Sequence, residues 1–366
     1  MALAAVLALG CGRAAVPAPV VPGETGAPAA SAAQQRPPVG VTSRVLVDAA
    51  RHRELATTIW YPAVAGTVEH EIEWDGIFVG FGAWDAALRP TPRRLPVVLL
   101  SHGSGGDASN LTWLAEALAS RGYLAVAMDH PGDRFGDTSV EGRFAAWRRA
   151  RDVSFVLTAL ETDATLGARI DRERVAAAGH SSGAYTVLAL AGLRLQPSAY
   201  LTYCSARQPG PDCKLFVDLR PDRIADLAEA GKSRRDRRIR AVLALAPVLG
   251  PAAIPASLRS ITVPVTIVGS PTDEIVPFAL NAARYQRFIP RARIVRIPDA
   301  DHFVFMPQCT LAGRLVAAQV CVDRNAAVDR AAVHARVVDV ALDFFDRALH
   351  VSPPRSARPR RAVPPG

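Results

Sequence analysis

Ser181 stands between two glycines in the run VAAAGHSSGAYTVLAL, residues 175–190, and is the first candidate for chemistry in this chain. Residues Gly179 to Gly183 fit the pattern G-x-S-x-G, with an apolar stretch on each side. A serine on a sharp turn between a strand and a helix needs neighbours without side chains two positions away. The turn also places the hydroxyl at a helix N-terminus, where the helix dipole favours a developing oxyanion. The pattern predicts that Ser181 is a nucleophile for acyl transfer.

A serine hydroxyl is a weak nucleophile and needs a base, which an acid must orient. His302, in IPDADHFVF, follows the last predicted strand, and we expect it to be the base. Asp273, in SPTDEIVP, follows the preceding predicted strand, and we expect it to be the acid. Glu274 is the main alternative. Asp299 and Asp301 are rivals that stand too close to His302 in sequence to reach its ring easily.

The other histidines near predicted elements have less direct roles. His102 and His180 adjoin strand ends, where we expect them to shape the local backbone. His130, in DHPGD, also follows a strand and is a candidate for lining the pocket. His334 and His350 lie in and after the last predicted helix, and we expect both at the surface.

Acyl transfer also needs N–H donors for the oxyanion of the tetrahedral intermediate. The residue after the nucleophile, Ser182, is expected to supply one backbone amide, and the loop SHGSGGD the other. The glycines Gly103, Gly105 and Gly106 let that loop approach a substrate closely. We expect Ser104 to be the second donor. The loop lacks the spacing of a phosphate-binding motif.

The elements that must position these residues alternate along the chain. Amphipathic segments typical of helices include 110–122, 144–161 and 333–349. This alternation predicts βαβ units and a mostly parallel sheet with helices on both faces. Eight segments are typical of strands: 44–49, 55–62, 95–103, 123–131, 174–181, 239–247, 263–270 and 292–300.

The chain divides by composition into a folded domain and flanking segments. Two insertions interrupt the alternation and could form walls of a binding cleft. The first is rich in aromatic residues. The predicted boundaries are a signal-like segment 1–11, an Ala/Pro-rich tether 12–40, an α/β domain 41–350 with insertions near 67–94 and 194–239, and a basic tail 351–366.

The first eleven residues, MALAAVLALGC, resemble a secretion signal that ends in a bacterial lipobox. Cys11 is therefore a candidate for lipidation, and the alternative is an ordinary cleaved signal with an incidental cysteine. We expect an exported protein, either secreted or held as a periplasmic or cell-surface lipoprotein. Membrane attachment would then occur through the lipid on Cys11.

The four remaining cysteines form two local pairs, which suits an oxidising compartment. We expect the disulfides Cys204–Cys213 and Cys309–Cys321, and the alternative is four buried thiols. No Cys-x-x-Cys or Cys/His spacing indicates zinc, so no metal and no cofactor is expected.

The net charge of +9 comes almost wholly from arginine, because Lys214 and Lys232 are the only lysines. No basic stripe with interleaved aromatic residues is present in the sequence. We therefore expect no nucleic-acid partner, and a monomer that takes a small-molecule or lipid ester.

Several motifs together resemble an α/β-hydrolase: LLSHGSGG, YLAVAMDHPG, AAGHSSGAYTVLALAG, IRAVLALAP, SPTDEIVP and DADHFVF. More closely, they are similar to bacterial predicted dienelactone hydrolases related to platelet-activating-factor acetylhydrolases. The resemblance covers roughly residues 40–350. It implies an α/β-hydrolase fold with an eight-stranded, mostly parallel sheet, and a carboxylic ester hydrolase with a Ser-His-Asp triad.

The sequence departs from this group at the proposed nucleophile. True dienelactone hydrolases use a cysteine where this chain has Ser181, and Ser182 and Ala184 replace the Phe and Gly often found there. The resemblance therefore implies an ester substrate without implying dienelactone. We expect a short-chain acyl or lipid-type ester, and the alternatives are a polyester hydrolase or a non-catalytic binding member of the fold.

Overall fold

The computed structural model describes residues 36–351, except residues 208, 209 and 217. The predicted signal segment with Cys11, nearly all of the tether, and the tail lie outside the described residues. Strand β1 already begins at Val39, within the segment predicted as tether. Val39 and Val41 are fully buried, and this burial places the start of the domain earlier than the composition suggested.

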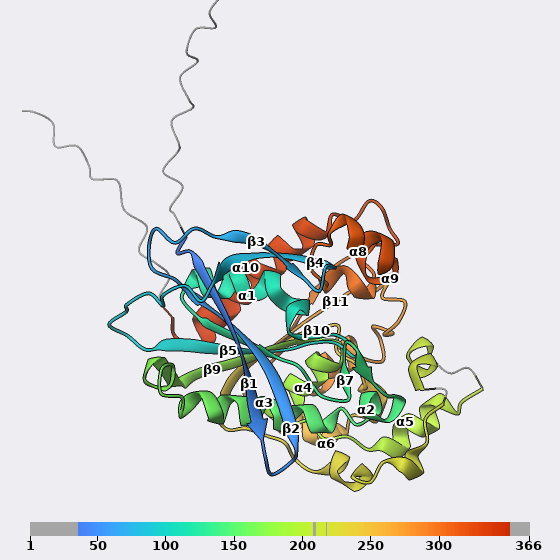
Figure 1. The fold of residues 1–366 in the computed structure, drawn as a ribbon. Coiled ribbons are helices and arrows are strands. Elements are labelled where there is room, and N and C mark those ends of the chain that lie inside the picture. Colours follow the sequence, from blue (N-terminus) through green and yellow to red (C-terminus); the bar gives the residue numbers. More distant parts are fainter. Residues whose placement is uncertain (1–35, 208–209, 217, 352–366) are drawn as a thin grey trace, which may run out of the picture. The chain divides into compact units, whose positions relative to one another are not determined.

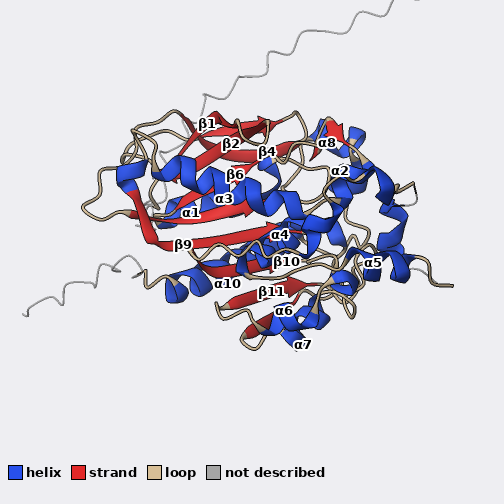
Figure 2. Ribbon diagram, turned by 90° about the horizontal axis from the view of Figure 1, so that it is seen from below, coloured by secondary structure: helices blue, strands red, loops and turns tan. Residues whose placement is uncertain are grey.

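Ten strands form one sheet in the order β12-β11-β10-β9-β5-β6-β2-β1-β4-β3 (Figures 1 and 2). From β6 to β12 all neighbouring strands are parallel, whereas β2 pairs antiparallel with both β6 and β1. The strands are β1 Val39–Asp48, β2 Arg53–Pro62, β3 His70–Trp74, β4 Phe78–Trp84, β5 Leu95–Ser101, β6 Leu124–Met128, β9 Ile170–His180, β10 Ile239–Leu245, β11 Val265–Gly269 and β12 Ala292–Arg296. A separate small ribbon pairs β7 Asp133–Arg134 with β8 Asp137–Thr138.

Strands β5 and β6 lie near the middle of the sheet, where helices cover both faces. Every residue of β5 and β6 is buried, as expected for parallel strands between two helical layers. Helices α1 and α10 pack on one face, and α3, α4 and α7 pack on the other (Figure 2). The predicted α/β fold with a mostly parallel sheet and helices on both faces is confirmed.

The helices vary widely in length. Among the described residues, no helix is long and apolar enough to cross a membrane. The helices are α1 Thr112–Arg121, α2 Val140–Phe144, α3 Trp147–Glu161, α4 Ser182–Ala191, α5 Pro197–Cys204, α6 Pro255–Arg259, α7 Ala282–Phe288, α8 Leu311–Val316, α9 Ala318–Cys321 and α10 Arg330–Ala348.

The sheet has two more strands than the sequence predicted, and both come from the insertion near 67–94. Strands β3 and β4 form a hairpin across a tight turn in which Asp75 and Gly76 have positive φ. Strand β4 then pairs with β1 through Gly40 and Ala83. Burial alternates along β4, which is the pattern of an outer strand with one covered face.

His334 is buried, so its predicted surface position is wrong. Helix α10 packs against α1 and against the 3₁₀ helix His302–Phe305, which together cover this ring. The His334 ring stacks on Trp113 with centroids 4.1 Å apart, and its Nε2 lies 2.9 Å from the carbonyl oxygen of Val304. Burial lowers the pKa of His334 to about 4, so the ring is neutral and Nε2 donates this hydrogen bond.

Two disulfides, Cys204–Cys213 and Cys309–Cys321, are present with the predicted pairing. The first joins the end of α5 to the 3₁₀ helix Pro211–Phe216, within the second insertion. The second closes the segment that contains α8 and α9. Each bond therefore fixes a short segment that lies outside the βαβ units.

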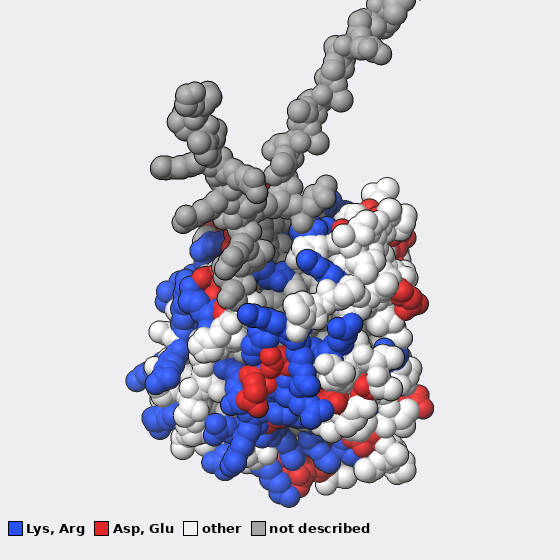
Figure 3. Space-filling view, turned by 90° about the vertical axis from the view of Figure 1, so that its left-hand side faces the viewer, with Lys and Arg blue, Asp and Glu red and all other residues white. Residues whose placement is uncertain are grey.

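Basic side chains gather on the face shown in Figure 3. Exposed arginines stand at or just before the starting ends of the parallel strands, namely Arg93, Arg94, Arg172, Arg240 and Arg291. The predicted catalytic residues follow the opposite, finishing ends of these strands. These arginines therefore lie away from the candidate site.

Candidate active site

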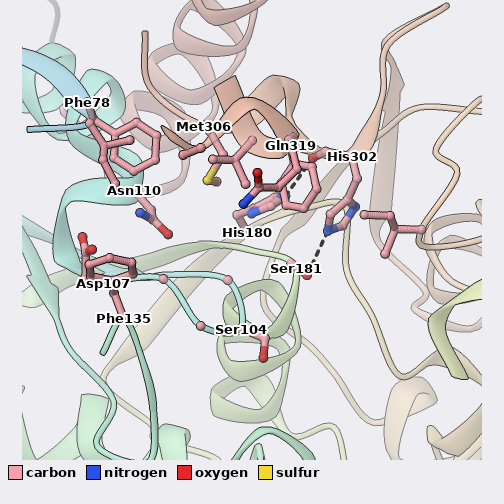
Figure 4. A pocket seen from close by; sticks show the side chains of 18 of the residues that line it. Phe78, Ser104, Asp107, Asn110, Phe135, His180, Ser181, His302, Met306 and Gln319 are labelled. Carbon is pink, nitrogen blue, oxygen red and sulfur yellow. Dashed lines mark hydrogen bonds between the residues drawn. The ribbon is translucent and has the colours of Figure 1, made fainter. Parts of the chain in front are cut away.

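Three side chains from separate loops meet where the parallel strands end. Figure 4 shows two of them, Ser181 and His302, beside the cavity. The Oγ atom of Ser181 lies 3.0 Å from Nε2 of His302, and Nδ1 of His302 lies 2.7 Å from Oδ2 of Asp273. All three residues are buried, with at most 9 % of their surface exposed. Because Nδ1 faces a carboxylate, it carries the proton, and Nε2 can accept one from the serine. The structure thus brings together the three residues predicted as nucleophile, base and acid.

Ser181 occupies a strained turn between β9 and α4. Its backbone has φ 55° and ψ −118°, a conformation that residues with side chains rarely adopt. The Ser181 amide donates to the carbonyl oxygen of Leu245 at 2.9 Å, and its carbonyl accepts from the amide of Tyr185 at 3.1 Å. These bonds anchor the turn to β10 and to the first turn of α4.

The two glycines around this serine are required by contact distances. A Cβ atom on Gly183 would lie 1.8 Å from the carbonyl oxygen of Ser101, and one on Gly179 would lie 2.4 Å from the carbonyl carbon of Gly183. Neither position can hold a side chain without moving backbone. The glycines therefore let the turn pack against the end of β5 while it presents Ser181.

The Asp273 carboxylate is held in place by the backbone that follows it. Its Oδ1 accepts hydrogen bonds from the amides of Ile275 at 3.0 Å and Val276 at 2.7 Å. This arrangement leaves Oδ2 directed at His302. Asp273 is thus oriented before any substrate is present.

The alternative acids do not reach the histidine ring. Glu274 accepts a hydrogen bond from the backbone amide of His302 at 3.3 Å. Asp301 caps the following 3₁₀ helix through the amide of Phe303. Asp299 is exposed. Among the four candidates, Asp273 alone contacts Nδ1 of the histidine.

The amides of Ser104 and Ser182 are free to bind a ligand. Within the described residues, neither donates a hydrogen bond to another protein group. Ser182 is the first residue of α4, so its amide has no acceptor inside the helix. Ser104 lines the same cavity as Ser181. The N–H groups of both predicted oxyanion donors are therefore available to bind the oxyanion.

The peptide between Gly103 and Ser104 is held from its carbonyl side. The Gly103 oxygen lies 2.6 Å from Nδ1 of His102 and accepts from Arg149 at 3.1 Å and from the Gly106 amide at 3.2 Å. In a trans peptide the C=O and N–H groups point in opposite directions. Fixing the Gly103 carbonyl therefore fixes the direction of the Ser104 N–H.

Arg149 and Asp133 form a buried ion pair beneath this loop. Each has 2 % of its surface exposed, and Nε of Arg149 lies 3.4 Å from Oδ2 of Asp133. Arg149 also donates to the His102 carbonyl at 2.7 Å. Oδ1 of Asp133 accepts from the Ser104 hydroxyl at 2.7 Å and from the Gly105 amide at 2.9 Å. With the bond from Arg149 to the Gly103 carbonyl, the pair therefore holds the loop at four successive residues, 102–105.

His130 lies beneath the site and does not line the cavity, so its candidate role there is wrong. The ring is fully buried, with Nδ1 3.0 Å from Asp152 and Nε2 2.9 Å from the Ser101 hydroxyl. Asp152 is held in turn by Arg51 and Arg53. Burial lowers the pKa of His130 to about 4. This ionic network holds the ring under the loop instead of toward the substrate.

His180 shapes the local backbone, as the sequence indicated. Burial lowers its pKa well below the usual range, so the ring is neutral. Its Nε2 lies 3.1 Å from the carbonyl oxygen of His302 and donates to it. The residue before the nucleophile thus positions the backbone of the predicted base.

A cavity of about 310 Å³ opens in front of Ser181. The β3–β4 hairpin supplies Ile77 and Phe78, and the segment after the predicted base supplies Phe303 and Met306. The first insertion is therefore a wall of the cleft, as predicted. Of the described residues in the second insertion, none lines this cavity.

The two sides of this wall are joined by backbone and disulfide bonds. The Val79 amide donates to the carbonyl of Gln308 at 2.8 Å, and the Thr310 amide donates to the carbonyl of Ile77 at 2.9 Å. The disulfide of Cys309 closes the segment immediately beyond. The hairpin and the 303–321 segment therefore form one continuous rim.

Sequence reasoning missed several residues of the site. Arg149 carried a usable signal, because it stands on the apolar stripe of α3 with Val153 and Val156. Phe135 and Asn110 also line the cavity, and no pattern in the sequence indicated this position for either residue. Within the described residues, no group of three or more His, Cys, Asp or Glu side chains is placed to hold a metal ion.

Comparison with known proteins agrees with this fold. Residues 97–318 match the sequence model described as the alpha/beta hydrolase family, and the chain belongs to that family. It is 26 % identical over 229 residues to "Cutinase est1" of Thermobifida alba, covering 61 % of this chain and 59 % of that protein. "Cutinase est2" of the same species is also 26 % identical over 229 residues, covering 61 % and 58 %.

The chain thus matches less than two thirds of the length of these curated relatives. Among solved structures, the "Ferulic acid esterase from Streptomyces cinnamoneus" superimposes with a TM-score of 0.58 at 23 % identity. That match covers 91 % of this chain and 96 % of the other. This likeness shows a shared fold.

Proposed function

We propose that this protein is a serine hydrolase of carboxylic esters. The observation that carries the proposal is the relay of Ser181, His302 and Asp273 at 3.0 and 2.7 Å, beside a cavity large enough for a small ester. Such a relay activates a hydroxyl for attack on a carbonyl carbon. The proposal agrees with the two curated relatives described above, both of which are named cutinases.

In the first half of the reaction, Ser181 attacks the ester carbonyl while Nε2 of His302 takes the hydroxyl proton. Asp273 stabilises the imidazolium that forms. The negative oxygen of the tetrahedral intermediate is bound by the amides of Ser104 and Ser182. The intermediate collapses, the bond to the alcohol oxygen breaks, and His302 gives its proton to the leaving alcohol.

In the second half, water enters and the acyl-enzyme is hydrolysed. His302 takes one proton from the water, and the resulting hydroxide attacks the acyl carbon. The same amides bind the second oxyanion. The bond to Ser181 Oγ breaks, the serine regains its proton from His302, and the acid leaves.

The size of the cavity favours a short acyl group or a single ring. At about 310 Å³ it stands at the lower end of the range for small-molecule sites. Its apolar lining, including Phe78 and Met306, suits an uncharged substrate portion. A small soluble ester is therefore the first substrate class to test.

A polyester or lipid-type ester is the second candidate, and the rim of the cavity favours it. Leu311, Leu315 and Val316 on α8 are 79, 78 and 73 % exposed. Ala317 and Val320, directly after them, line the cavity. Large apolar side chains exposed beside a site suit contact with a water-insoluble substrate.

Within the family, we propose membership of the dienelactone-hydrolase-like group related to platelet-activating-factor acetylhydrolases, on the sequence motifs given above. We also propose that the protein is exported, because two disulfides are favoured in oxidising compartments. Attachment through a lipid on Cys11 is part of that proposal. Intact mass of membrane-extracted protein tests it, since a diacyl group on Cys11 is expected and an unmodified or absent Cys11 would contradict lipidation.

Hydrolysis of p-nitrophenyl acetate tests the proposed function directly. Ser181→Ala should lower kcat by roughly 10⁵-fold or more while circular dichroism stays unchanged. Ser198→Ala, at an exposed serine on α5, is the matched control and should keep wild-type activity. Activity of Ser181→Ala near the wild-type level would refute the proposal.

A further inference from the structure

Asn110 is a buried polar side chain without a protein partner, and it lines the cavity. Only 4 % of the residue is exposed. Within the described residues, its carboxamide makes no hydrogen bond to another protein group. The amide atoms of Asn110 are not among the enclosed polar atoms without a partner, so a ligand or an ordered water in the cavity can reach them.

The Asn110 carboxamide points into the cavity from the end opposite Ser181 (Figure 4). It passes over Gly106, where a Cβ atom would lie 1.8 Å from Oδ1 of Asn110. The missing side chain at Gly106 therefore makes the space through which the amide reaches the cavity. Catalytic and polar groups thus stand at separate ends of one space.

The backbone that carries Asn110 is rigid. It belongs to the 3₁₀ helix Ala108–Leu111, which Asp107 caps through the amide of Ser109 at 2.8 Å. The Ala108 amide is held by Asp129 at 2.9 Å. A polar group mounted on fixed backbone is pre-organised for binding.

Asp107 adds a second polar group at the same end. Its Oδ1 is occupied by Ser109, whereas Oδ2 accepts no hydrogen bond from the described residues. Asp107 lines the cavity together with Asp75. Burial, helped by the charges of Asp75 and Asp129, raises the pKa of Asp107 to about 6. The carboxyl is mainly ionised at neutral pH and accepts hydrogen bonds.

The space between the catalytic serine and this polar end is lined mainly by apolar side chains, although the polar side chain of Gln319 also lies there. Phe78 and Met306 line one side of it, and Phe135 lines the other. Aromatic walls favour a flat ring or a similar apolar group. A substrate that fills the cavity would therefore place its far end against Asn110 and Asp107.

We propose that Asn110 and Asp107 form a subsite for a neutral hydroxyl group, carried on a ring-sized apolar portion of the ester substrate. This inference rests on the proposed function. The carboxamide can donate to the hydroxyl oxygen while a carboxylate oxygen accepts the hydroxyl proton. The hydroxyl thus satisfies both groups.

Charged alternatives fit less well. A carboxylate on the substrate would meet the negative charges of Asp75 and Asp107, which outnumber the one arginine, Arg143, among the described residues that line the cavity. An ammonium group can only donate hydrogen bonds, so it would leave the Asn110 NH₂ group without an acceptor. A hydroxyl is the simplest group with both a donor and an acceptor.

Matched substrate pairs test the subsite. The acyl arm compares methyl hydrocinnamate with its para-hydroxy derivative, and the alcohol arm compares phenethyl acetate with its para-hydroxy derivative. We expect the wild-type enzyme to prefer the hydroxylated ester in one arm by about tenfold in kcat/KM. The arm that shows the preference identifies which portion of the ester enters the subsite.

Asn110→Leu should reduce this preference to about twofold or less, since its isosteric side chain makes no hydrogen bond. Gln286→Leu, the same kind of change at an exposed amide on α7, is the matched control and should keep the wild-type preference. If Asn110→Leu does not fold, Asn110→Asp keeps the shape, removes the donor and should lose the preference too.

Three results would overturn the subsite. These are no preference in either arm for the wild type, an undiminished preference in the Asn110 variants, or a stronger preference for para-aminomethyl or para-carboxy derivatives. In each case the unsubstituted esters are still hydrolysed through Ser181, so the proposed function stands. If no ester is hydrolysed, the proposed function and the subsite both fall.

Discussion

Replacing Arg149 by lysine should slow the reaction without weakening substrate binding. Arg149 contacts the carbonyls of His102 at 2.7 Å and Gly103 at 3.1 Å, and it faces Asp133 from its Nε edge. A lysine has one nitrogen and cannot reach both carbonyls and the carboxylate in the same geometry. The Gly103 carbonyl then loses one of its restraints, and the N–H of Ser104 is less well aimed at the oxyanion.

The expected loss of kcat in Arg149→Lys is smaller than the loss caused by removing an oxyanion donor completely. Complete loss of one oxyanion donor typically lowers kcat by about 10²–10³-fold. In Arg149→Lys the Gly103 carbonyl keeps its contacts with His102 and with the Gly106 amide, so we expect a partial loss of about 10- to 100-fold. At about 1.4 kcal/mol per tenfold, this is roughly 1.4–2.8 kcal/mol of transition-state stabilisation.

The assay is steady-state hydrolysis of p-nitrophenyl acetate, with the thermal midpoint measured on the same sample. KM should change by less than about threefold, because the ground-state ester does not use the oxyanion donors fully. Arg148→Lys, at the neighbouring arginine that pairs with Asp226, is the matched control. A folded Arg149→Lys with wild-type kcat, or one that changes KM alone, would refute the reasoning.

Three further predictions concern the relay, a buried histidine and the wall of the cavity. Asp273→Asn should lower kcat by about 10⁴-fold in ester hydrolysis, because His302 loses the acceptor that fixes its tautomer; a loss below tenfold would argue against this role. The pKa of His334 is about 4 in the folded state, below the usual 6.5. Between pH 4 and 6.5 the unfolded chain therefore binds more protons than the folded chain, so the free energy of unfolding decreases as the pH falls through this range. His334→Gln should therefore lose less stability from pH 6.5 to 4, and urea-unfolding midpoints that change in parallel with the wild type would contradict this. Removing the disulfide with Cys309→Ser and Cys321→Ser should lower stability by about 3 kcal/mol and raise KM by loosening the rim, whereas an unchanged thermal midpoint and KM would count against it.

The catalytic candidates could be predicted because they depend on local pattern and on sheet direction. Ser181 lies on a strand-to-helix turn whose glycines are visible in the sequence. Asp273 and His302 follow successive parallel strands, and such strands end at the same edge of the sheet. Chain order together with strand direction is therefore enough to bring the three together.

Apart from the first insertion as a wall of the cleft, the surroundings of these residues could not be predicted, because they depend on contacts between distant segments. Phe78 reaches the cavity only because β4 pairs with β1 and with the segment around Cys309. His334 is buried because α10 packs against both α1 and the segment after the predicted base. No local period encodes either contact, since each needs two elements far apart in the chain to meet.

The buried polar groups were missed for a different reason, although Arg149 left a trace in the sequence as a polar residue on the apolar stripe of α3. Arg149 and Asn110 are residue types that usually lie at the surface, so composition places them there by default. Their burial depends on partners such as Asp133 and on the space left by Gly106. Buried polar side chains of this kind are identified from the contacts in the folded structure.

The most direct test is to locate a fluorophosphonate adduct by peptide mass mapping of the wild-type protein. Phosphonylation needs an activated serine and an oxyanion site, so it reports on Ser181, His302 and the two amides together. We predict a single adduct on the peptide that contains Ser181, and none in the Ser181→Ala variant. An adduct on another serine, or ester hydrolysis that continues without any adduct, would contradict the assignment of Ser181 as the nucleophile.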